Sequence, residues 1–385
     1  MVSYRSSTVA LNEDYLSVLD GFVTYKTICS FLMYMLDNLS EISAIDRSGM
    51  LDTIAKFPEQ IEESIGIAKK LKVDIEREID KILISGMGGS AISGDIVQGW
   101  LRDSTNAPIF VNREYTVPKW VDNRTLSIFL SYSGNTEETL SAMDDAHAKG
   151  SMCIGISSGG LLKEKCEQYS YPHLQIPSGF QPRAATAYLL FPTIVLLKSA
   201  GVISYDISNE LNETIEVTRE LRNRNKKEIL ESENQAKQIA ETIYETIPNI
   251  YGWNYYAPIA KRWRTQLNEN SKVIARDDIV SECNHNDIVG WSFDPEVSKK
   301  SSCILLRDIK HEPTQVSKRF EFMKKLFNNV AANTVEVNAI GETLLARMIS
   351  LMYIGDFVSI YLALLRKVDP TPVDIITELK TELAR

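Results

Sequence analysis

The sequence predicts an α/β protein with two similar halves, each a mostly parallel sheet flanked by helices. Short apolar runs alternate with helical segments in both halves of the 385-residue chain, and this alternation is typical of parallel sheets with helices on both faces. Turns rich in glycine and serine follow two of the runs, as in open sheets that bind ligands at the carboxyl ends of their strands. An apolar content of 44% suffices for more than one core, so two domains are expected.

Composition excludes several classes of partner. A formal net charge of -9 gives no general attraction for nucleic acid or anionic membranes, so neither is expected. The longest apolar run near the N-terminus, residues 22–36, contains Lys26 and is shorter than the roughly 20 residues of a membrane span. The five cysteines are scattered, which indicates neither disulfides nor a zinc site, and histidines and carboxylates do not share ligand spacing. We therefore expect a cytoplasmic protein without metal or cofactor.

Residues 1–49 do not join easily to the rest of the chain. They mix aromatic residues and methionine with serine and threonine, whereas a cleaner helical pattern begins at Met50 and continues to Leu71. We expect an N-terminal appendage over 1–49, either poorly ordered or not native. The N-terminal mass of the natural protein tests whether translation begins at Met1 or Met50.

The first domain is expected over residues 50–205 and carries two candidate ligand loops. The predicted strands are 81–84, 108–112, 126–131 and 152–157, and the predicted helices are 50–71, 91–101 and 188–200. The turn that contains Ser131, Ser133 and Thr136 places hydroxyls and backbone N–H groups between a strand and a helix. It is either an anion site or an ordinary helix cap. The turn that contains Gly89 and Ser90 is similar, and no lysine follows its glycines as in a Walker loop.

Arg183 follows Pro182 at the start of a predicted helix. A cation at a helix N-terminus is unfavourable unless it meets an anion. Arg183 therefore binds either an anionic ligand or a local carboxylate.

The remaining chain is expected to form a solvated helical linker over 206–245 and a second domain over 246–385. The linker is rich in charged residues. The predicted strands of the second domain are 250–253, 289–291, 302–306 and 334–337, and the predicted helices are 257–270, 344–365 and 373–384.

Six segments in order resemble one known family. They are 86–91, 131–139, 179–185, 268–270, 282–286, and the tail from 355–356 through 369–372. Together they resemble the bifunctional phosphoglucose/phosphomannose isomerases of the sugar isomerase (SIS) superfamily, from about Met50 to the C-terminus. The resemblance implies two SIS-type domains, hexose 6-phosphate substrates and a homodimer.

The resemblance also implies a role for each matching residue. The sugar-phosphate binders would be Gly89, Ser90, Ser131, Ser133 and Thr136. Glu269 would move a proton between C1 and C2, Arg183 would stabilise the enediolate, and His285 of the partner subunit would open the ring. Thr371 would leave room for either C2 epimer, and Lys380 would be an active-site lysine.

The chemistry of these residues agrees with those roles. Interconverting an aldose and a ketose phosphate needs a carboxylate at the carbon-bound proton, a group that opens the ring and a cation near the enediolate oxygens. Taken alone, a glutamate such as Glu269 is more often a surface helix residue, and a histidine such as His285 is more often a hydrogen-bonded turn residue. The other histidines, His147, His173 and His311, lie in less suggestive settings. The predicted function is metal-independent interconversion of glucose 6-phosphate, mannose 6-phosphate or both with fructose 6-phosphate.

Two alternatives belong to other classes. A non-catalytic sugar-phosphate-sensing module has the same fold, but such a regulator usually carries a basic DNA-binding domain, and residues 1–49 are not basic enough. An amidotransferase-type sugar isomerase would need a glutamine-hydrolysing domain with an N-terminal cysteine, which this sequence lacks.

Overall fold

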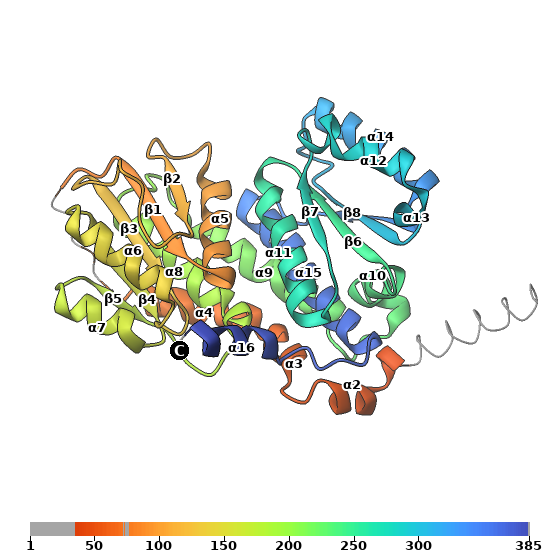
Figure 1. The fold of residues 1–385 in the computed structure, drawn as a ribbon, viewed down its shortest axis with the longest axis horizontal. Coiled ribbons are helices and arrows are strands. Elements are labelled where there is room, and N and C mark those ends of the chain that lie inside the picture. Colours follow the sequence, from red (N-terminus) through yellow and green to blue (C-terminus); the bar gives the residue numbers. More distant parts are fainter. Residues whose placement is uncertain (1–34, 72, 74–76, 384–385) are drawn as a thin grey trace, which may run out of the picture.

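Two parallel sheets lie side by side, with helices between and around them (Figure 1). The structure is a computed structural model that describes residues 35–71, 73 and 77–383. The first sheet has the strand order β2-β1-β3-β4-β5 and the second β7-β6-β8-β9. All neighbouring strands are parallel, which confirms the predicted fold class.

The first sheet is built from alternating strands and helices. Its elements are α2 (Leu39–Ile45), α3 (Met50–Ala55), α4 (Phe57–Ala68), β1 (Lys81–Gly86), α5 (Gly88–Leu101), β2 (Ile109–Asn112), β3 (Thr125–Leu130), α6 (Glu137–Ala148), β4 (Met152–Ser157), α7 (Gly160–Gln168), β5 (His173–Gln175), the 3-10 turn η1 (Pro182–Ala184) and α8 (Thr186–Ser199).

Both faces of this sheet are buried because side chains of a strand alternate between its faces. Leu83 and Phe129 belong to a cluster with residues of α6 and α7, whereas Ile84 and Ile128 belong to the large core with α5 and α8. That large core continues into the second half, so the two sheets share one hydrophobic interior.

The second half begins with two helices and continues with the second sheet. Its elements are α9 (Ser208–Asn225), η2 (Glu231–Glu233), α10 (Gln235–Thr242), β6 (Ile247–Gly252), η3 (Asn254–Tyr256), α11 (Ala257–Ser271), β7 (Arg276–Ile279), η4 (Cys283–His285), α12 (Asp287–Phe293), α13 (Pro295–Ser298), β8 (Ser301–Arg307), α14 (Thr314–Val330), β9 (Asn333–Asn338), α15 (Leu344–Leu365) and α16 (Asp374–Leu383).

Helix α15 is the central helix of the shared core. This 22-residue helix is long and apolar enough to span a membrane by length and composition, yet its most apolar 18-residue window is fully buried, and α9, α10 and α11 pack against the helix. A helix that is apolar on all sides needs such cover. Helix α11 packs closely on it at Gly355, where a Cβ would lie 2.3 Å from Trp263 Nε1.

Two local predictions differ from the structure, and one edge strand was not predicted. The predicted helix 50–71 is two helices, because Pro58 in the first turn of α4 lacks an N–H and its ring excludes a continuous helix. The predicted strand 289–291 is wrong, since these residues lie in α12, and a short apolar run does not distinguish strand from helix. The edge strand β7 was not predicted because its sequence, Arg-Asp-Asp-Ile, is polar.

The expected appendage and linker both contribute to the core. Met35 and Leu36 are buried, and the Asp46 carboxylate accepts hydrogen bonds from two backbone N–H groups at the start of α3, each at 2.8 Å. Residues 35–49 are therefore part of the body of the protein, and residues 1–34 lie outside the described residues. In the expected linker, α9 packs against α15 and buries Leu211 and Leu221. All buried residues of α9 are uncharged, so its charged residues lie outside the core.

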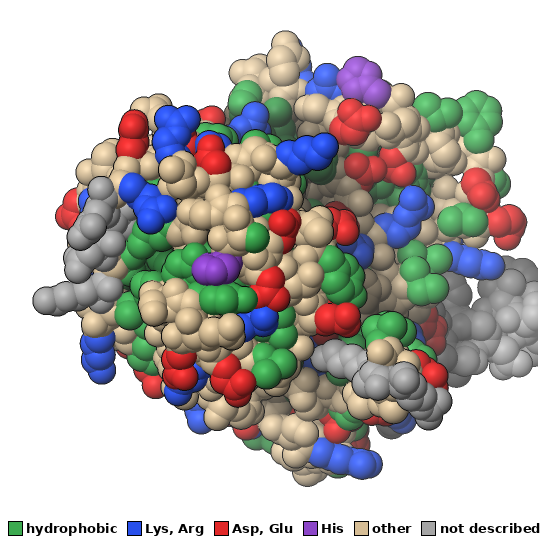
Figure 2. Space-filling view, turned by 60° about the vertical axis from the view of Figure 1, so that its left-hand side comes forward, with side chains coloured by type: hydrophobic (Ala, Val, Ile, Leu, Met, Phe, Trp, Pro, Cys, Tyr) green, Lys and Arg blue, Asp and Glu red, His purple; other side chains and the backbone are tan. Residues whose placement is uncertain are grey.

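Surface charge is mixed. On the face drawn in Figure 2, Lys and Arg side chains are interspersed with Asp and Glu, without a large area of one sign.

Candidate active site

Two loops meet at the carboxyl edge of the first sheet. Residues 86–90 follow β1 and residues 131–136 follow β3, and these strands are adjacent and parallel. A Cβ on Gly86 would lie 2.8 Å from the carbonyl oxygen of Leu130. The glycine therefore allows the two loops to approach closely.

Hydroxyl groups lie along these loops. Ser131 Oγ is 2.9 Å from Thr136 Oγ1 and accepts a hydrogen bond from the Thr136 N–H at 3.4 Å. Ser133 is exposed, and its Oγ accepts from the Asn135 N–H at 3.3 Å. Ser90 is buried in the first turn of α5. Hydroxyls beside the N-termini of two helices can bind an anion without a nearby cation.

Arg183 is buried in η1 beside the first loop, with 2% of its surface exposed. A Cβ on Gly89 would lie 3.2 Å from Arg183 Cα. Arg183 Nε donates to Asn270 Oδ1 at 2.6 Å, and Nη2 donates to the carbonyl oxygens of Pro370 at 2.7 Å and Thr371 at 2.8 Å. These three hydrogen bonds fix the orientation of the guanidinium group.

The other terminal nitrogen of Arg183, Nη1, is buried without a hydrogen-bond partner among the residues that the structure describes. It lies 3.6 Å from Glu269 Oε2, close enough for an ion pair but too far for a hydrogen bond. Thr371 Oγ1 is a second buried polar atom without a partner. Burial lowers the pKa of Arg183, and the Glu269 carboxylate opposes this shift. Buried unpaired polar atoms are rare, so Arg183 Nη1 beside the Glu269 carboxylate is a candidate ligand-binding group.

A buried ion pair holds the backbone of Arg183. Arg262 Nη2 donates to the Arg183 carbonyl oxygen at 3.0 Å. Arg262 also donates to both carboxylate oxygens of Asp356, at 3.0 and 2.8 Å, and Gln266 Nε2 donates to Asp356 Oδ1 at 2.9 Å. The pair connects η1 to α11 and α15 and so fixes the arginine relative to the second half of the chain.

Comparison with known proteins identifies the family. A bifunctional phosphoglucose/phosphomannose isomerase from Caldicellulosiruptor bescii is 41% identical over 338 residues, which cover 87% of this chain and 99% of that protein. The chain belongs to the bifunctional phosphoglucose/phosphomannose isomerase family. A relative of the same name from Aquifex aeolicus is 38% identical over 306 residues, covering 79% of this chain and 90% of that protein. The resemblance seen in the sequence and the expected isomerase class are confirmed.

The fold agrees with membership of this isomerase family. Residues 232–383 match a family model described as the bacterial phospho-glucose isomerase C-terminal SIS domain. A solved structure of a glucose-6-phosphate isomerase like protein from Thermus thermophilus has a TM-score of 0.58 and 18% identity, covering 89% of this chain and 99% of that chain. The second likeness concerns the fold alone.

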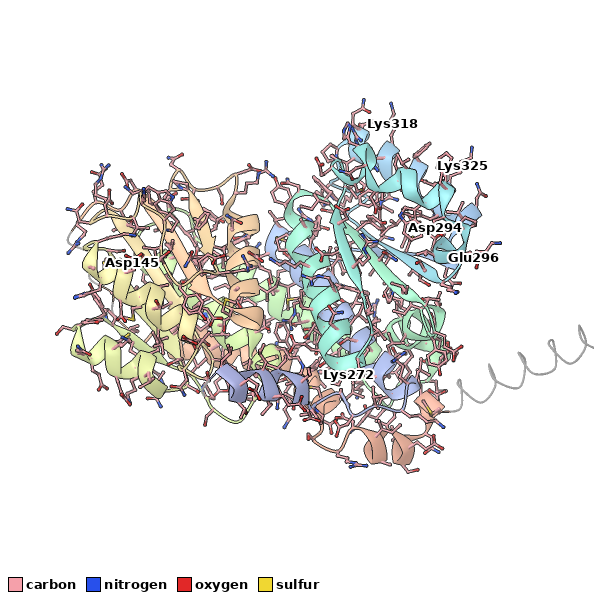
Figure 3. The ribbon with its side chains drawn as sticks, in the orientation of Figure 1. Asp145, Lys272, Asp294, Glu296, Lys318 and Lys325 are labelled. Atoms are coloured by element: carbon pink, nitrogen blue, oxygen red, sulfur yellow. The ribbon has the colours of Figure 1, made fainter. Side chains whose placement is uncertain are left out.

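A single chain of this isomerase family member does not bring all predicted residues together. Glu269 precedes β7 and His285 follows it, so they lie toward opposite ends of that strand. His285 is exposed in η4, which contacts α14 through a hydrogen bond from Arg319 Nη1 to Asn284 Oδ1 at 3.1 Å. Figure 3 labels Lys272, just after α11, and Lys318, on α14, and these two lysines lie at opposite ends of the second half of the protein. Lys380 belongs to α16, and its side chain lies outside the described residues.

Several residues at the site of this isomerase family member were not predicted from sequence. Asn270, which holds Arg183, belongs to the segment 268–270 and could have been found there. Lys272, in a left-handed conformation after α11, donates to the carbonyl oxygens of Glu269 and, at 3.2 Å, of Pro370. Burial lowers the pKa of Lys272, and the charge of Arg183 adds to this effect. No local pattern marks the lysine, because its partners become neighbours only in the fold.

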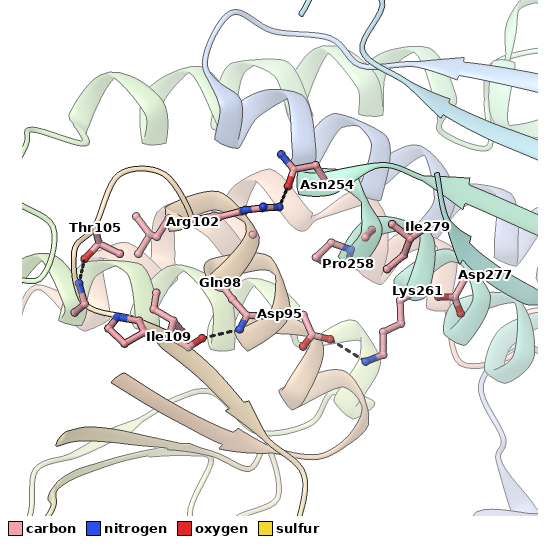
Figure 4. A pocket seen from close by; sticks show the side chains of 15 residues that line it. Asp95, Gln98, Arg102, Thr105, Ile109, Asn254, Pro258, Lys261, Asp277 and Ile279 are labelled. Atoms are coloured by element: carbon pink, nitrogen blue, oxygen red, sulfur yellow. Dashed lines mark hydrogen bonds and ion pairs between the residues drawn. The ribbon is translucent and has the colours of Figure 1, made fainter. Parts of the chain in front are cut away.

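A cavity of about 550 Å³ between α5 and α11 is a separate feature of this isomerase fold (Figure 4). Lys261 Nζ on α11 donates to Asp95 Oδ2 on α5 at 3.1 Å, and Arg102 bonds to Asn254 farther along the groove. No predicted site residue lines this cavity. Across the described part of the chain, no group of three or more His, Cys, Asp or Glu side chains could hold a metal ion.

Proposed function

We propose that this chain is an aldose–ketose isomerase that interconverts glucose 6-phosphate, mannose 6-phosphate or both with fructose 6-phosphate. One observation carries the proposal: the unpaired Nη1 of buried Arg183 lies 3.6 Å from Glu269 Oε2, beside two hydroxyl-lined loops. A sugar phosphate needs an anion site, a base and a cation in one place. The names of its relatives point to the same reaction.

The loops of the first sheet would bind the phosphate group. Ser90, Ser131, Ser133 and Thr136 would donate hydrogen bonds to its oxygens, and Gly89 would keep the first loop close to Arg183. These loops lie on strands and helix N-termini of a buried sheet, so their geometry is set before the substrate binds. Phosphate binding would then place C1 and C2 of the open-chain sugar near Glu269.

Glu269 and Arg183 would carry the proton transfer. The Glu269 carboxylate would take the proton from C2 of the aldose, and the C–H electron pair would form the C1–C2 double bond of the enediolate. Arg183 Nη1 would stabilise the negative charge on the enediolate oxygens. Return of the proton to C1, with the hydroxyl proton of O2 passing to O1, would give the ketose, and the transfer would proceed without a metal ion. Thr371 would face C2 of either epimer, and Lys380 would complete the site.

Ring opening would require a homodimer in which His285 enters the site of the partner. His285 is exposed and lies away from Glu269 in its own chain. Helix α12 follows it and exposes Val289 and Phe293, which are 59% and 83% accessible. Exposed apolar side chains beside a histidine fit a surface that a second copy covers.

The four described cysteines are buried and free, which agrees with a reducing cytoplasm.

An assay of both hexose phosphates separates the enzyme from a sugar-phosphate sensor. Fructose 6-phosphate is supplied, and the formation of glucose 6-phosphate or mannose 6-phosphate is followed with coupled enzymes. Glu269→Gln should lower kcat by about 100-fold or more while phosphate binding stays unchanged, because it removes only the general base. Glu233→Gln, an exposed glutamate of η2, is the matched control. A Glu269→Gln chain that keeps most of its turnover would refute the base assignment.

Mixing two inactive variants tests the shared site. Glu269→Gln and His285→Ala chains, unfolded together and refolded, form mixed dimers in which one of the two sites is intact. Random pairing should restore about a quarter of the parent activity. If the mixture stays as inactive as its components, His285 acts within its own chain or not at all.

A further inference from the structure

A third turn lies at the carboxyl edge of the first sheet, next to the loop 131–136. It comprises residues 157–162, which connect β4 to α7, and β4 is the parallel neighbour of β3. Its side chains have no part in the chemistry proposed above. Its contacts with the loop after β3 are nevertheless extensive.

The third turn is hydrogen-bonded to the loop 131–136 through backbone and side-chain atoms. The Ser158 N–H and Oγ both donate to the Tyr132 carbonyl oxygen, at 2.9 and 2.8 Å. The Leu162 N–H donates to the Gly134 carbonyl oxygen at 2.9 Å. The Leu161 N–H donates to Asn135 Oδ1 at 3.0 Å. Each residue between Ser131 and Thr136 except Ser133 is thus tied to the third turn.

The closest approach is between two glycines. A Cβ on Gly134 would lie 1.8 Å from the Gly159 carbonyl oxygen, and Gly134 has a φ of +73° that favours glycine. Any displacement of the Gly159 peptide toward β3 would therefore move the Gly134 turn. The position of the Gly159 carbonyl group limits where Ser133 and its neighbours lie.

One side chain fixes the Gly159 peptide. Ser157 Oγ is buried and donates to the Gly159 carbonyl oxygen at 2.7 Å, and it accepts from the Gly159 N–H at 3.2 Å. His173 Nε2 lies 2.8 Å from Ser157 Oγ. With the Ser157 hydroxyl donating to the Gly159 carbonyl oxygen, Ser157 Oγ is left to accept from His173, which assigns the tautomer with hydrogen on Nε2.

His173 is well placed to hold Ser157. It lies on β5, where it pairs with Gly155 in the parallel register, two residues before Ser157 on β4. Burial lowers the pKa of His173, and the charge of Lys163 adds to this effect, so the neutral ring is favoured. The neutral ring with hydrogen on Nε2 makes the observed bond.

We propose that His173 and Ser157 are positioning residues that hold the Gly159 peptide against the Gly134 turn and so set the geometry of the phosphate-binding loop. They would touch no substrate atom. The inference rests on the proposed function insofar as the bound anion is the phosphate of a hexose 6-phosphate. Loss of either side chain would weaken phosphate binding and leave the proton transfer at Glu269 intact.

The test compares four variants of the full chain. His173→Leu removes the donor, Ser157→Ala removes the hydroxyl, His173→Gln keeps an N–H donor at a similar reach, and His147→Leu is the matched control. His147 lies in the same half, with its Nδ1 3.0 Å from the Tyr171 hydroxyl and its ring stacked on Tyr169. KM and kcat for fructose 6-phosphate, the Kd for inorganic phosphate by calorimetry and the melting temperature are measured for each.

His173→Leu and Ser157→Ala should raise KM and the phosphate Kd together by about three- to tenfold, with kcat within about twofold of the parent. His173→Gln and His147→Leu should leave all three near the parent values. If His173→Leu folds poorly, Ser157→Ala, which only removes one atom, still decides the question.

The inference is overturned if Ser157→Ala leaves the phosphate Kd unchanged, or if kcat falls as much as KM rises. It is also overturned if the parent chain does not bind phosphate. If the parent binds phosphate but does not turn over fructose 6-phosphate, the isomerase proposal fails, and the phosphate Kd values still test the positioning role.

Discussion

Replacing Thr371 with valine should stabilise the free protein and weaken substrate binding. Thr371 Oγ1 is buried and makes no hydrogen bond, although the backbone carbonyl of the same residue accepts from Arg183 Nη2 at 2.8 Å. Valine has nearly the same shape and keeps that carbonyl group. The substitution therefore removes an unsatisfied hydroxyl and little else.

The magnitude follows from the cost of burying an unpaired polar group. That cost is about 1–3 kcal/mol, so Thr371→Val should raise the free energy of unfolding by about 1 kcal/mol or more. If the hydroxyl instead bonds to the sugar in the complex, its loss should raise KM by about two- to tenfold. The two effects have opposite signs, as expected where a binding group is kept at the expense of stability.

Thermal melting of the free protein and steady-state kinetics with fructose 6-phosphate measure the two effects. Thr334→Val is the matched control, because Thr334 Oγ1 on β9 is likewise buried without a partner and lies outside the site. The control should be stabilised to a similar degree with KM unchanged. A Thr371→Val chain that is less stable than the parent, or that binds substrate equally well, would refute this account of the threonine.

Two further predictions concern stability. Burial next to Glu231 raises the pKa of Glu241 from 4.5 to about 7, so the folded protein holds a proton that the unfolded chain releases, and stability falls as pH rises through this interval. At pH 8 the free energy of unfolding of Glu241→Gln should therefore exceed that of the parent by about 1–2 kcal/mol, after allowance for partial exposure. At pH 4, where the carboxyl group is protonated in both states, the two proteins should be equally stable. The same difference at both pH values would contradict the proposed cause. Asp356→Ala leaves buried Arg262 without its counter-ion and should lower the free energy of unfolding in urea by about 3–5 kcal/mol. Asp277→Ala, which breaks the more exposed pair with Arg264, should cost less than about 1 kcal/mol, and equal losses would refute the argument from burial.

The loops that follow β1 and β3 were predictable because their signal is local. A buried strand, a run of glycine and serine and a helical pattern follow one another within about fifteen residues, and parallel strands place such turns at one edge. Met152–Ser157 and Leu344–Leu365 were likewise predicted at their observed bounds. The edge strand β7 was missed because none of its residues is buried, so its side chains need not be apolar.

The partners of Arg183 were not predictable in the same way. Asn270 lies 87 residues away in sequence and Pro370 187 residues away. Nothing near Arg183 in the sequence indicates that its guanidinium group is held by two backbone carbonyl groups from the C-terminal segment. The pairing of Arg262 with Asp356 is also formed only when α11 packs against α15.

The sequence alone determined the α/β class, the two glycine- and serine-rich turns and the identity of the family, because these depend on residue order within short segments. Tertiary structure decided which polar atoms remain unpaired. Arg183 Nη1 and Thr371 Oγ1 become buried and partnerless only when η1, the end of α11 and the segment before α16 meet. His173 gained its proposed role in the same way, since parallel pairing of β4 and β5 brings it to Ser157. Burial and unmet hydrogen-bonding capacity are properties of the packed chain, and local sequence does not encode them.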